Sequence, residues 1–522
     1  MAIALPPPIT PQQAPIEELR AQSADAVLLD YRGIRIHLFG PAIAAHIVDP
    51  QRLQKTVSAA DTPSDAVREI GYLHYVAGYP ATLVSYAIAD GKDLYIRVVP
   101  GHVSQVRGPA QFTAYFDNLK KPAPLTAADL EADRALADAL SERGGKQLRP
   151  ELRPLGGDAV SLDLGEATDS GKQNAAVAEF SNYGNRYAGP YLADVGLRHS
   201  FGSGDELSVA GIASTRFLGL GGSHSEPYHE GDLGWSRITR IGVFGLQGRY
   251  ADFQQTLPGD VVEGKLDSGA LSWLYPLYAD FQHRLNLSSS FDHSDETLDL
   301  RQNGSRLLSE RYFSLATDLS YVQRIEHGDQ RIEIQTDLGI RHGLGRDDTT
   351  STPANLGYVL LRPSFSLRYG ATPHWTFAGE GSVQFSGSRL PQQEQFVIGG
   401  PASLHAYNAG VGVGDRGENL RLSTEWRGTG DSWIVSHQLR PRLFAEYGSA
   451  TSSHGAPAPL PGAPGAAATV SLADVGADVE LHLTPWLAGT LSVAQSVYDH
   501  GGNYSPDGLA KRYVFFHLAA KY

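Results

Sequence analysis

The sequence of 522 residues has no cysteine, which suits a chain that crosses an oxidising periplasm without mispaired thiols. It also lacks any run of 18 consecutive apolar residues, so no transmembrane helix is predicted. A transmembrane β-barrel stays compatible with this pattern, because its lipid-facing and lumen-facing residues alternate. The first eight residues have neither a basic start nor a long apolar core, so we expect the signal peptide to be absent from this sequence.

Basic residues are too few for a phosphate-binding surface: 43 Lys and Arg stand against 57 Asp and Glu, with a net charge of -14, which argues against nucleic acid as a partner. The 57 glycines and 31 prolines also argue against a mostly helical protein. Neither a Gly-x-Ser-x-Gly elbow nor a Gly-x-x-x-x-Gly-Lys-Ser/Thr loop occurs, so we expect no catalytic residues, no enzyme activity and no cofactor.

Two polar clusters contain residue types that bind metals, but their spacing is irregular and both are expected to be solvated surface loops. We therefore predict no metal site. The clusters are His224, Glu226, His229 and Glu230, and Asp292, His293, Asp295 and Glu296.

Residues 1–170 mix helical and strand patterns. We divide them into an extension at 1–29, with a short helix near Ile16–Val27, and two modules at 30–101 and 102–170. The alternative is one irregular α+β domain. The first module is expected to run strand, helix, helix, strand, strand, and the second to repeat strand, helix, strand, strand. The expected elements are 33–39, 50–59, 63–77, 81–88 and 94–99, then 103–106, 127–143, 148–152 and 160–164.

From residue 171 to residue 522 the helical period disappears and alternating segments recur. At about 20 to 22 residues for each strand and its connection, this length predicts about 16 antiparallel strands. The last segment places Val514, Phe516, Leu518, Ala520 and Tyr522 on one face, as expected of a strand that closes a barrel. The predicted fold is therefore an all-β transmembrane barrel preceded by two small α+β domains. Alternating segments include 191–199, 206–212, 241–250, 312–321, 331–340, 358–367, 419–426, 439–447, 475–483 and 486–494.

A glycine-rich motif near residue 400 makes a family resemblance specific. The sequence reads Phe396, Val397, Ile398, Gly399, Gly400, then Leu404, His405, Ala406, Tyr407, and later Gly414, Asp415, Arg416, Gly417. This resembles the two-partner-secretion outer-membrane transporters of the ShlB/FhaC/HecB hemolysin secretion and activation family. There, Phe-x-Ile-Gly-Gly leads into a long loop that folds back into the barrel and carries a Val-Arg-Gly-Tyr tip. The resemblance implies an in-folded loop at 399–417 with Leu404–Tyr407 as its tip.

The family pairs the arginine of this tip with the aspartate of a Phe-x-Asp-x-Gly motif on a barrel strand. Here that motif reads Phe444, Ala445, Glu446, Tyr447, Gly448, so both members of the pair differ together. A histidine can still hydrogen-bond a carboxylate, and the longer Glu446 offsets the shorter reach of His405. The alternative is that His405 and Glu446 never meet and are ordinary polar residues of the lumen.

Further positions resemble the family in order along residues 30–522. Glu179–Gly189 is similar to its first barrel strand, and the two N-terminal modules look like its paired polypeptide-transport-associated (POTRA) domains. The resemblance implies periplasmic modules that bind an unfolded exoprotein, an adhesin or a hemolysin, which the barrel then exports to the cell surface. The loop, and the helix near Ile16–Val27, would plug the lumen.

An exposed sheet edge is the expected binding surface, because it accepts an extended chain through backbone hydrogen bonds. Candidate edges are 81–88, 94–99 and 160–164, unless these strands are paired internally. Besides the exoprotein, only outer-membrane lipid is expected as a partner, and the protein is expected to be a monomer. Rival functions are an outer-membrane assembly or insertion factor of the same superfamily and, outside it, a ligand-uptake channel or a barrel enzyme.

Overall fold

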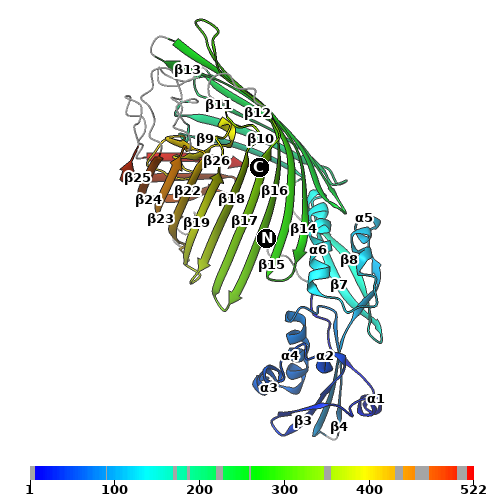
Figure 1. Ribbon diagram of the computed structural model, residues 1–522. Coiled ribbons are helices and arrows are strands. Elements are labelled where there is room, and N and C mark those ends of the chain that lie inside the picture. Colours follow the sequence, from blue (N-terminus) through cyan, green and yellow to red (C-terminus); the bar gives the residue numbers. More distant parts are fainter. Residues whose placement is uncertain are drawn as a thin grey trace.

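The computed structural model describes residues 6–89, 91–168, 173–184, 189–218, 227–257, 260–345, 354–428, 439–452, 469–501 and 514–522. Within them, sixteen strands form one closed antiparallel barrel, as the sequence predicts, and two small sheets with helices lie at one of its ends (Figure 1). None of the helices in these ranges is long and apolar enough to cross a membrane. The barrel strands are β9 (Asn174–Ser181), β10 (Leu192–Ser200), β11 (Asp205–Ser214), β12 (Tyr228–Thr239), β13 (Gly242–Leu257), β14 (Asp260–Ala279), β15 (His283–Leu300), β16 (Arg306–His327), β17 (Gln330–Gly343), β18 (Val359–Gly370), β19 (Trp375–Ser386), β22 (Arg416–Trp426), β23 (Arg440–Thr451), β24 (Thr469–Thr484), β25 (Leu487–His500) and β26 (Val514–Lys521).

Side chains alternate between the two faces of the barrel wall. On β10, Val195 and Leu197 are exposed, and on β23 Leu443 and Tyr447 are exposed while Glu446 between them is buried. Because successive residues of a strand point to opposite faces, the apolar set faces outward and the polar set faces the lumen. This alternation is the pattern from which the strands are predicted.

The barrel closes where the last strand meets the first. In β26, His517 to Lys521 pair with β9 in antiparallel register, and the backbones of Tyr522 and Ala176 exchange two hydrogen bonds of 2.8 and 3.0 Å. The prediction that the C-terminal segment closes the barrel is therefore confirmed. Of the first-strand motif, residues 185–188 lie outside the described residues.

Several barrel strands are longer than the sequence pattern predicts. β16 has 22 residues, about twice the length needed to cross a bilayer. The two polar clusters expected to be loops lie partly in such extensions: β12 includes His229 and Glu230, and β15 includes the whole of 292–296. The prediction of loops is wrong there, because arginines of neighbouring strands pair with these acids and allow polar strands to continue, as in Arg249–Glu230 and Arg311–Asp295. His224 and Glu226 lie outside the described residues.

The first N-terminal sheet has the strand order β1-β4-β5-β3-β2, in which β1 is the two-residue strand Gln12–Gln13. Two helices expected from the sequence cover it, and both begin at a proline behind a side-chain cap, Asp49 for α3 and Thr62 for α4. Ile36, Ile70 and Ile96 are fully buried between helices and sheet. The elements are β2 (Val27–Tyr31), β3 (Ile34–Phe39), α2 (Pro41–Ala44), α3 (Pro50–Ala59), α4 (Pro63–Val76), β4 (Thr82–Ala89) and β5 (Asp93–Pro100).

The N-terminal extension does not plug the barrel. Its helix α1 (Ile16–Ala21) packs on β4 and β5, where Leu19 is buried with Phe39 and Tyr95, and the residues after it form the edge strand β2. The expected helix therefore ends six residues early. The physical reason is that Leu19 finds an apolar site on the nearest sheet, whereas the lumen offers polar side chains.

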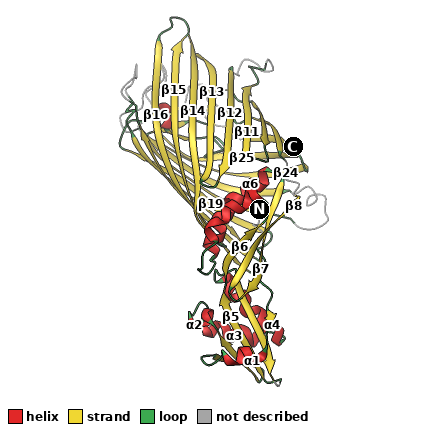
Figure 2. Cartoon of the chain, turned by 90° about the vertical axis from the view of Figure 1, so that its right-hand side faces the viewer, coloured by secondary structure: helices red, strands yellow, loops and turns green. Residues whose placement is uncertain are grey.

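The second sheet, of order β6-β8-β7, lies against the end of the barrel. It comprises β6 (His102–Arg107), β7 (Lys146–Gly156) and β8 (Ala159–Thr168). The helix α6 (Ala127–Arg143) of the same module runs across the end of the barrel wall that faces the module and contacts β14 (Figure 2). Two short helices that the sequence pattern missed, α5 (Ala110–Thr113) and η1 (Ala114–Leu119), bury Phe112 and Phe116 in the same core. That core continues onto the barrel through Ile238.

Candidate functional site

The connection between β19 and β22 turns into the barrel. It forms a small hairpin of β20 (Phe396–Ile398) and β21 (Gly412–Gly414), in which Phe396 pairs with Gly414 and Ile398 with Gly412. Gly399 and Gly400 follow with φ of 100° and 78°, a region that favours glycine. A Cβ on Gly399 would lie 2.1 Å from the carbonyl oxygen of Asn408, so only glycine lets the chain turn here.

The tip that follows is fully enclosed by the barrel wall. Leu404, Ala406 and Tyr407 have no exposed surface, and His405 has 4%. The tip is held together by its own backbone, since Gly400 N–H donates to the carbonyl of Tyr407 at 2.8 Å and Leu404 N–H to the carbonyl of Gly400 at 2.8 Å. The loop therefore presents a compact turn to the wall.

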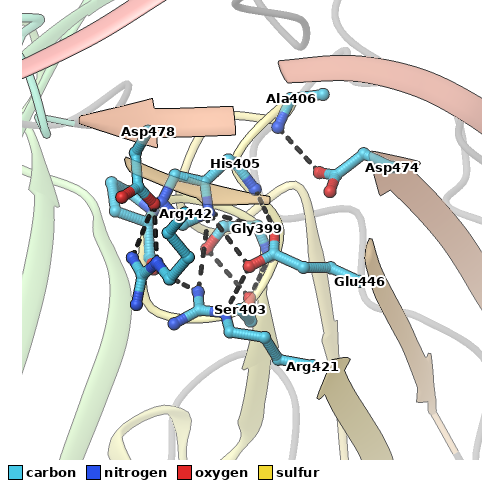
Figure 3. Close-up of polar contacts among 10 residues, drawn as sticks. Gly399, Ser403, His405, Ala406, Arg421, Arg442, Glu446, Asp474 and Asp478 are labelled. Carbon is cyan, nitrogen blue, oxygen red and sulfur yellow. Dashed lines mark hydrogen bonds and ion pairs between the residues drawn. The ribbon is translucent and has the colours of Figure 1, made fainter. Parts of the chain in front are cut away.

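Two carboxylates on neighbouring strands receive consecutive backbone amides of this tip (Figure 3). His405 N–H donates to Glu446 Oε2 at 2.7 Å, and Ala406 N–H donates to Asp474 Oδ2 at 2.7 Å. Nδ1 of the His405 ring also lies 3.0 Å from both oxygens of Glu446. The structure thus brings His405 and Glu446 together, and adds Asp474 as a partner that the family resemblance did not indicate.

A guanidinium completes the cluster from the wall and not from the loop. Arg421 on β22 stands directly opposite Glu446 on β23, donates from Nε to its carboxylate, and donates from Nη2 to the loop carbonyl of Pro401 at 2.7 Å. Hydrogen bonds in which one partner is ionised are roughly twice as strong as neutral ones. The cation that the tip lacks is therefore supplied by a neighbouring strand.

Aromatic packing fixes the same turn from the other side. The ring of Phe444 lies 4.5 Å from that of His405, and Tyr407 reaches β25, where its hydroxyl is 2.6 Å from Ser496 Oγ and 2.8 Å from the carbonyl of Tyr498. Gly448 leaves room for Leu404, whose Cδ1 would be 3.0 Å from a Cβ at that position. Of the wall motif, Phe444 and Glu446 thus contact the tip, and Gly448 provides space.

The remaining frame residues hold the hairpin, and Ile398 and Phe396 also belong to the apolar cluster around the tip. Asp415 is buried and accepts the N–H of Leu390 at 2.8 Å. Gly414 passes the wall so closely that a Cβ would lie 2.5 Å from the carbonyl oxygen of Thr451, and Phe396 packs its ring onto Gly417. These positions set the path of the chain between the wall and the tip.

The same connection is attached a second time, to another part of the wall. Its short helix η2 (Gln392–Glu394) carries a buried carboxylate, Glu394, which pairs with Arg341 on β17 at 2.9 Å and with Arg362 on β18 at 3.4 Å. Gln392 N–H donates to Glu310 on β16 at 2.7 Å. The segment 387–415 therefore contacts the wall at β16–β18 and again at β22–β25.

Sequence reasoning missed Arg421, Asp474 and Glu394. The signal was present in part, because these residues are polar positions in or beside strongly alternating strands. Their meeting depends on strand register: Arg421 pairs across to Glu446, and Glu446 to Asp474, in one row over β22, β23 and β24. In the described ranges, no three His, Asp or Glu side chains are grouped as a metal ion would need.

The sequence of this chain is similar to a known protein family, and its fold is similar to those of known proteins. Residues 167–472 match the sequence profile described as haemolysin secretion/activation protein ShlB/FhaC/HecB. No curated protein matches the sequence. The fold is similar to CdiB from Escherichia coli, with a TM-score of 0.66 at 15% identity over 100% of this chain and 95% of that one. It is also similar to CdiB from Acinetobacter baumannii, with a TM-score of 0.60 at 12% identity over 99% and 95%.

A third similar structure is BamA from Haemophilus ducreyi lacking POTRA domains 1-3, with a TM-score of 0.50 at 12% identity over 93% of this chain and 99% of that one. At such identities the likeness concerns the fold, that of a 16-stranded barrel preceded by POTRA-like α+β elements.

Proposed function

Because the matched residues make up more than half of its length, the chain belongs to the haemolysin secretion/activation protein ShlB/FhaC/HecB family of outer-membrane transporters, and we propose that it exports one partner exoprotein to the cell surface by two-partner secretion. The exoprotein is of the adhesin or hemolysin type and crosses in unfolded form. In this proposal the N-terminal modules lie in the periplasm, and the transporter works as a monomer without cofactor or catalytic group.

The observation that supports export most directly is the loop across the lumen. Its tip is held by a small set of polar contacts, His405 and Ala406 N–H to Glu446 and Asp474, with Arg421 as the counter-charge. Each hydrogen bond to a charged group contributes about 1.5–3 kcal/mol, so the contacts keep the lumen closed at rest yet yield to a chain that binds more strongly. Withdrawal of the tip would open a polar path for an extended polypeptide.

The driving force in this proposal is folding of the exoprotein outside the cell. The sequence has no phosphate-binding loop, and the periplasm supplies no nucleotide. An unfolded chain that emerges and folds at the surface cannot slide back, because return would require unfolding. The polar lumen wall would leave the passing backbone solvated until that point.

The test is secretion of the protein encoded beside this gene, for which we expect a large, repeat-rich exoprotein. The two are produced together, and exoprotein at the surface is measured by protease accessibility on intact cells. We expect surface exoprotein only with the transporter present, and altered secretion for His405→Ala and Glu446→Gln. The double variant should differ from the sum of the single effects, because the residues are in contact.

A matched control is Glu333→Gln, whose carboxylate pairs with Arg324 at an exposed position of the barrel wall. It should secrete like the unaltered transporter. Equal surface exoprotein in cells without the transporter would overturn the proposal. A loss of other outer-membrane barrels in those cells, with the exoprotein unaffected, would instead support an assembly or insertion factor.

A further inference from the structure

One strand edge of the first N-terminal sheet is already occupied by the chain itself. The two-residue strand β1 (Gln12–Gln13) lies parallel to β4, with Gln12 opposite Ser85 and Gln13 opposite Tyr86. The next residue continues the pairing, because Ala14 N–H donates to the carbonyl of Tyr86 at 3.1 Å. An extended segment is thus seated on β4 through its backbone.

The other two strands predicted to offer a free edge, β5 and β8, lie inside their sheets. β5 lies between β4 and β3, and β8 lies between β6 and β7, so both have hydrogen-bonded neighbours on each side. Among the three candidates only β4 has a side that a further chain can reach. That side is the one that Gln12–Gln13 now covers.

Proline keeps this occupant short. Pro11 and Pro15 flank the paired residues, and proline has no N–H to donate to a neighbouring strand. In the described residues the register accordingly covers two of the eight residues of β4. A proline-free segment of eight residues would make several more backbone hydrogen bonds with the same edge, and would therefore replace the occupant at a net gain.

The segment is fixed at both ends, so it can leave β4 without leaving the module. Before it, the carbonyl of Pro6 accepts the hydroxyl of Tyr75 at 3.0 Å, and Ile9 packs against the core of the second module. After it, α1 is anchored by the buried Leu19. Residues between these anchors form a strap over the edge, held in its middle by few contacts.

We propose that Gln12–Gln13 is an internal placeholder, which an extended segment of the exported chain displaces in order to add to β4. This inference rests on the proposed function for the identity of the incoming chain. Displacement would couple arrival of the exoprotein to release of the strap. The strap reaches Tyr75, whose ring stacks at 5.1 Å on Phe281 in the β14–β15 turn of the barrel.

The test locks the strap in place within the full chain in detergent. Because the sequence has no cysteine, Gln12→Cys with Ser85→Cys gives a single disulfide between directly paired residues. The probe is a fluorescein-labelled peptide of alternating threonine and valine with a lysine at each end. The oxidised protein should bind it at least about tenfold more weakly than the same sample after reduction, a difference of about 1.4 kcal/mol. Equal binding would overturn the placeholder.

A second pair of variants tests release without a disulfide. Ala14→Pro removes the N–H that donates to Tyr86 and should tighten binding of the probe, whereas Ala14→Gly keeps the N–H and should not. Unchanged binding in Ala14→Pro would contradict the proposal. Both measurements use binding alone, so they can fail while secretion proceeds; absence of secretion by the unaltered transporter would instead count against the proposed function.

Discussion

Arg421 and Glu446 are direct cross-strand neighbours on β22 and β23, and the guanidinium of Arg421 joins the carboxylate of Glu446 to the loop carbonyl of Pro401. The family resemblance predicts a positive charge on the loop tip and a carboxylate on the wall. In this chain the tip carries His405, while the guanidinium comes from the wall. The anchor has been rearranged so that the loop contributes mainly backbone groups.

Removing the guanidinium should therefore loosen the tip more than removing the imidazole does. In Arg421→Gln the buried Glu446 is left without its counter-charge and Pro401 without a donor. In His405→Ala the ring no longer contacts Glu446 and Phe444, but the backbone N–H of residue 405 can still donate to Glu446. We expect the amides of His405 and Ala406 to exchange with deuterium about tenfold faster or more in Arg421→Gln. The control is Arg311→Gln, an exposed arginine on β16 that pairs with Asp295. A larger effect in His405→Ala would contradict this assignment.

Gly399→Ala should displace the loop through a steric clash added to an unfavourable φ. The new Cβ would meet the carbonyl of Asn408 at 2.1 Å, so the turn that starts the tip cannot close. Protease cleavage between 399 and 411 in detergent should increase strongly. Gly410→Ala is the matched variant, because Gly410 has a φ of 80° but open space around its Cβ. Similar cleavage in the two variants would assign the effect to φ alone.

Asp133 on α6 should make the second module less stable at neutral pH. Burial, and then the charge of Asp129, raise the pKa of the Asp133 carboxyl from 3.8 to about 6. A raised carboxyl pKa favours the folded state when the group is protonated, so this stability is present below about pH 4 and is lost as the pH rises to about 6. At pH 7.5, Asp133→Asn should increase the free energy of unfolding by about 1 kcal/mol and therefore raise the unfolding temperature. At pH 4 the unfolding temperature should be unchanged. An equal shift at both pH values would contradict the ionisation argument.

Arg143 should hold the second module against the barrel. At the end of α6 its guanidinium donates to the carbonyl of Gly204 and, at 2.7 Å, to Ser236 Oγ, both on the barrel. In Arg143→Ala we expect a broader distance distribution between spin labels placed on the module and on the barrel, which the absence of native cysteine makes easy to attach. Arg149→Ala changes an exposed arginine of the same module and should leave the distribution narrow. A narrow distribution in Arg143→Ala would show that the apolar packing around Ile238 suffices.

The longer helices and most strands of the N-terminal modules were predictable because their signals are local, whereas β2 and the short helices α2, α5 and η1 were not predicted. Proline at the first helical position marks α3 and α4, and alternation marks β3, β4 and β5. The helix α1 was placed correctly at its start but assigned to the wrong surroundings. Its single buried residue, Leu19, is compatible with any apolar site, and the local pattern does not say which one is nearest.

The sequence by itself determined that a long alternating region ends in a strand suited to close a barrel, and that a glycine-rich turn lies near Gly399. That the tip faces the Glu446 motif was implied only by the family resemblance, and the sequence left open that the two never meet. Alternation and φ preferences are properties of neighbouring residues, so they can be read along the chain. Only the tertiary structure decided that Arg421, Glu446 and Asp474 form one row, that Glu394 attaches the loop to β17 and β18, and that Gln12–Gln13 covers β4. Those contacts depend on strand register and closure, which join residues far apart in sequence.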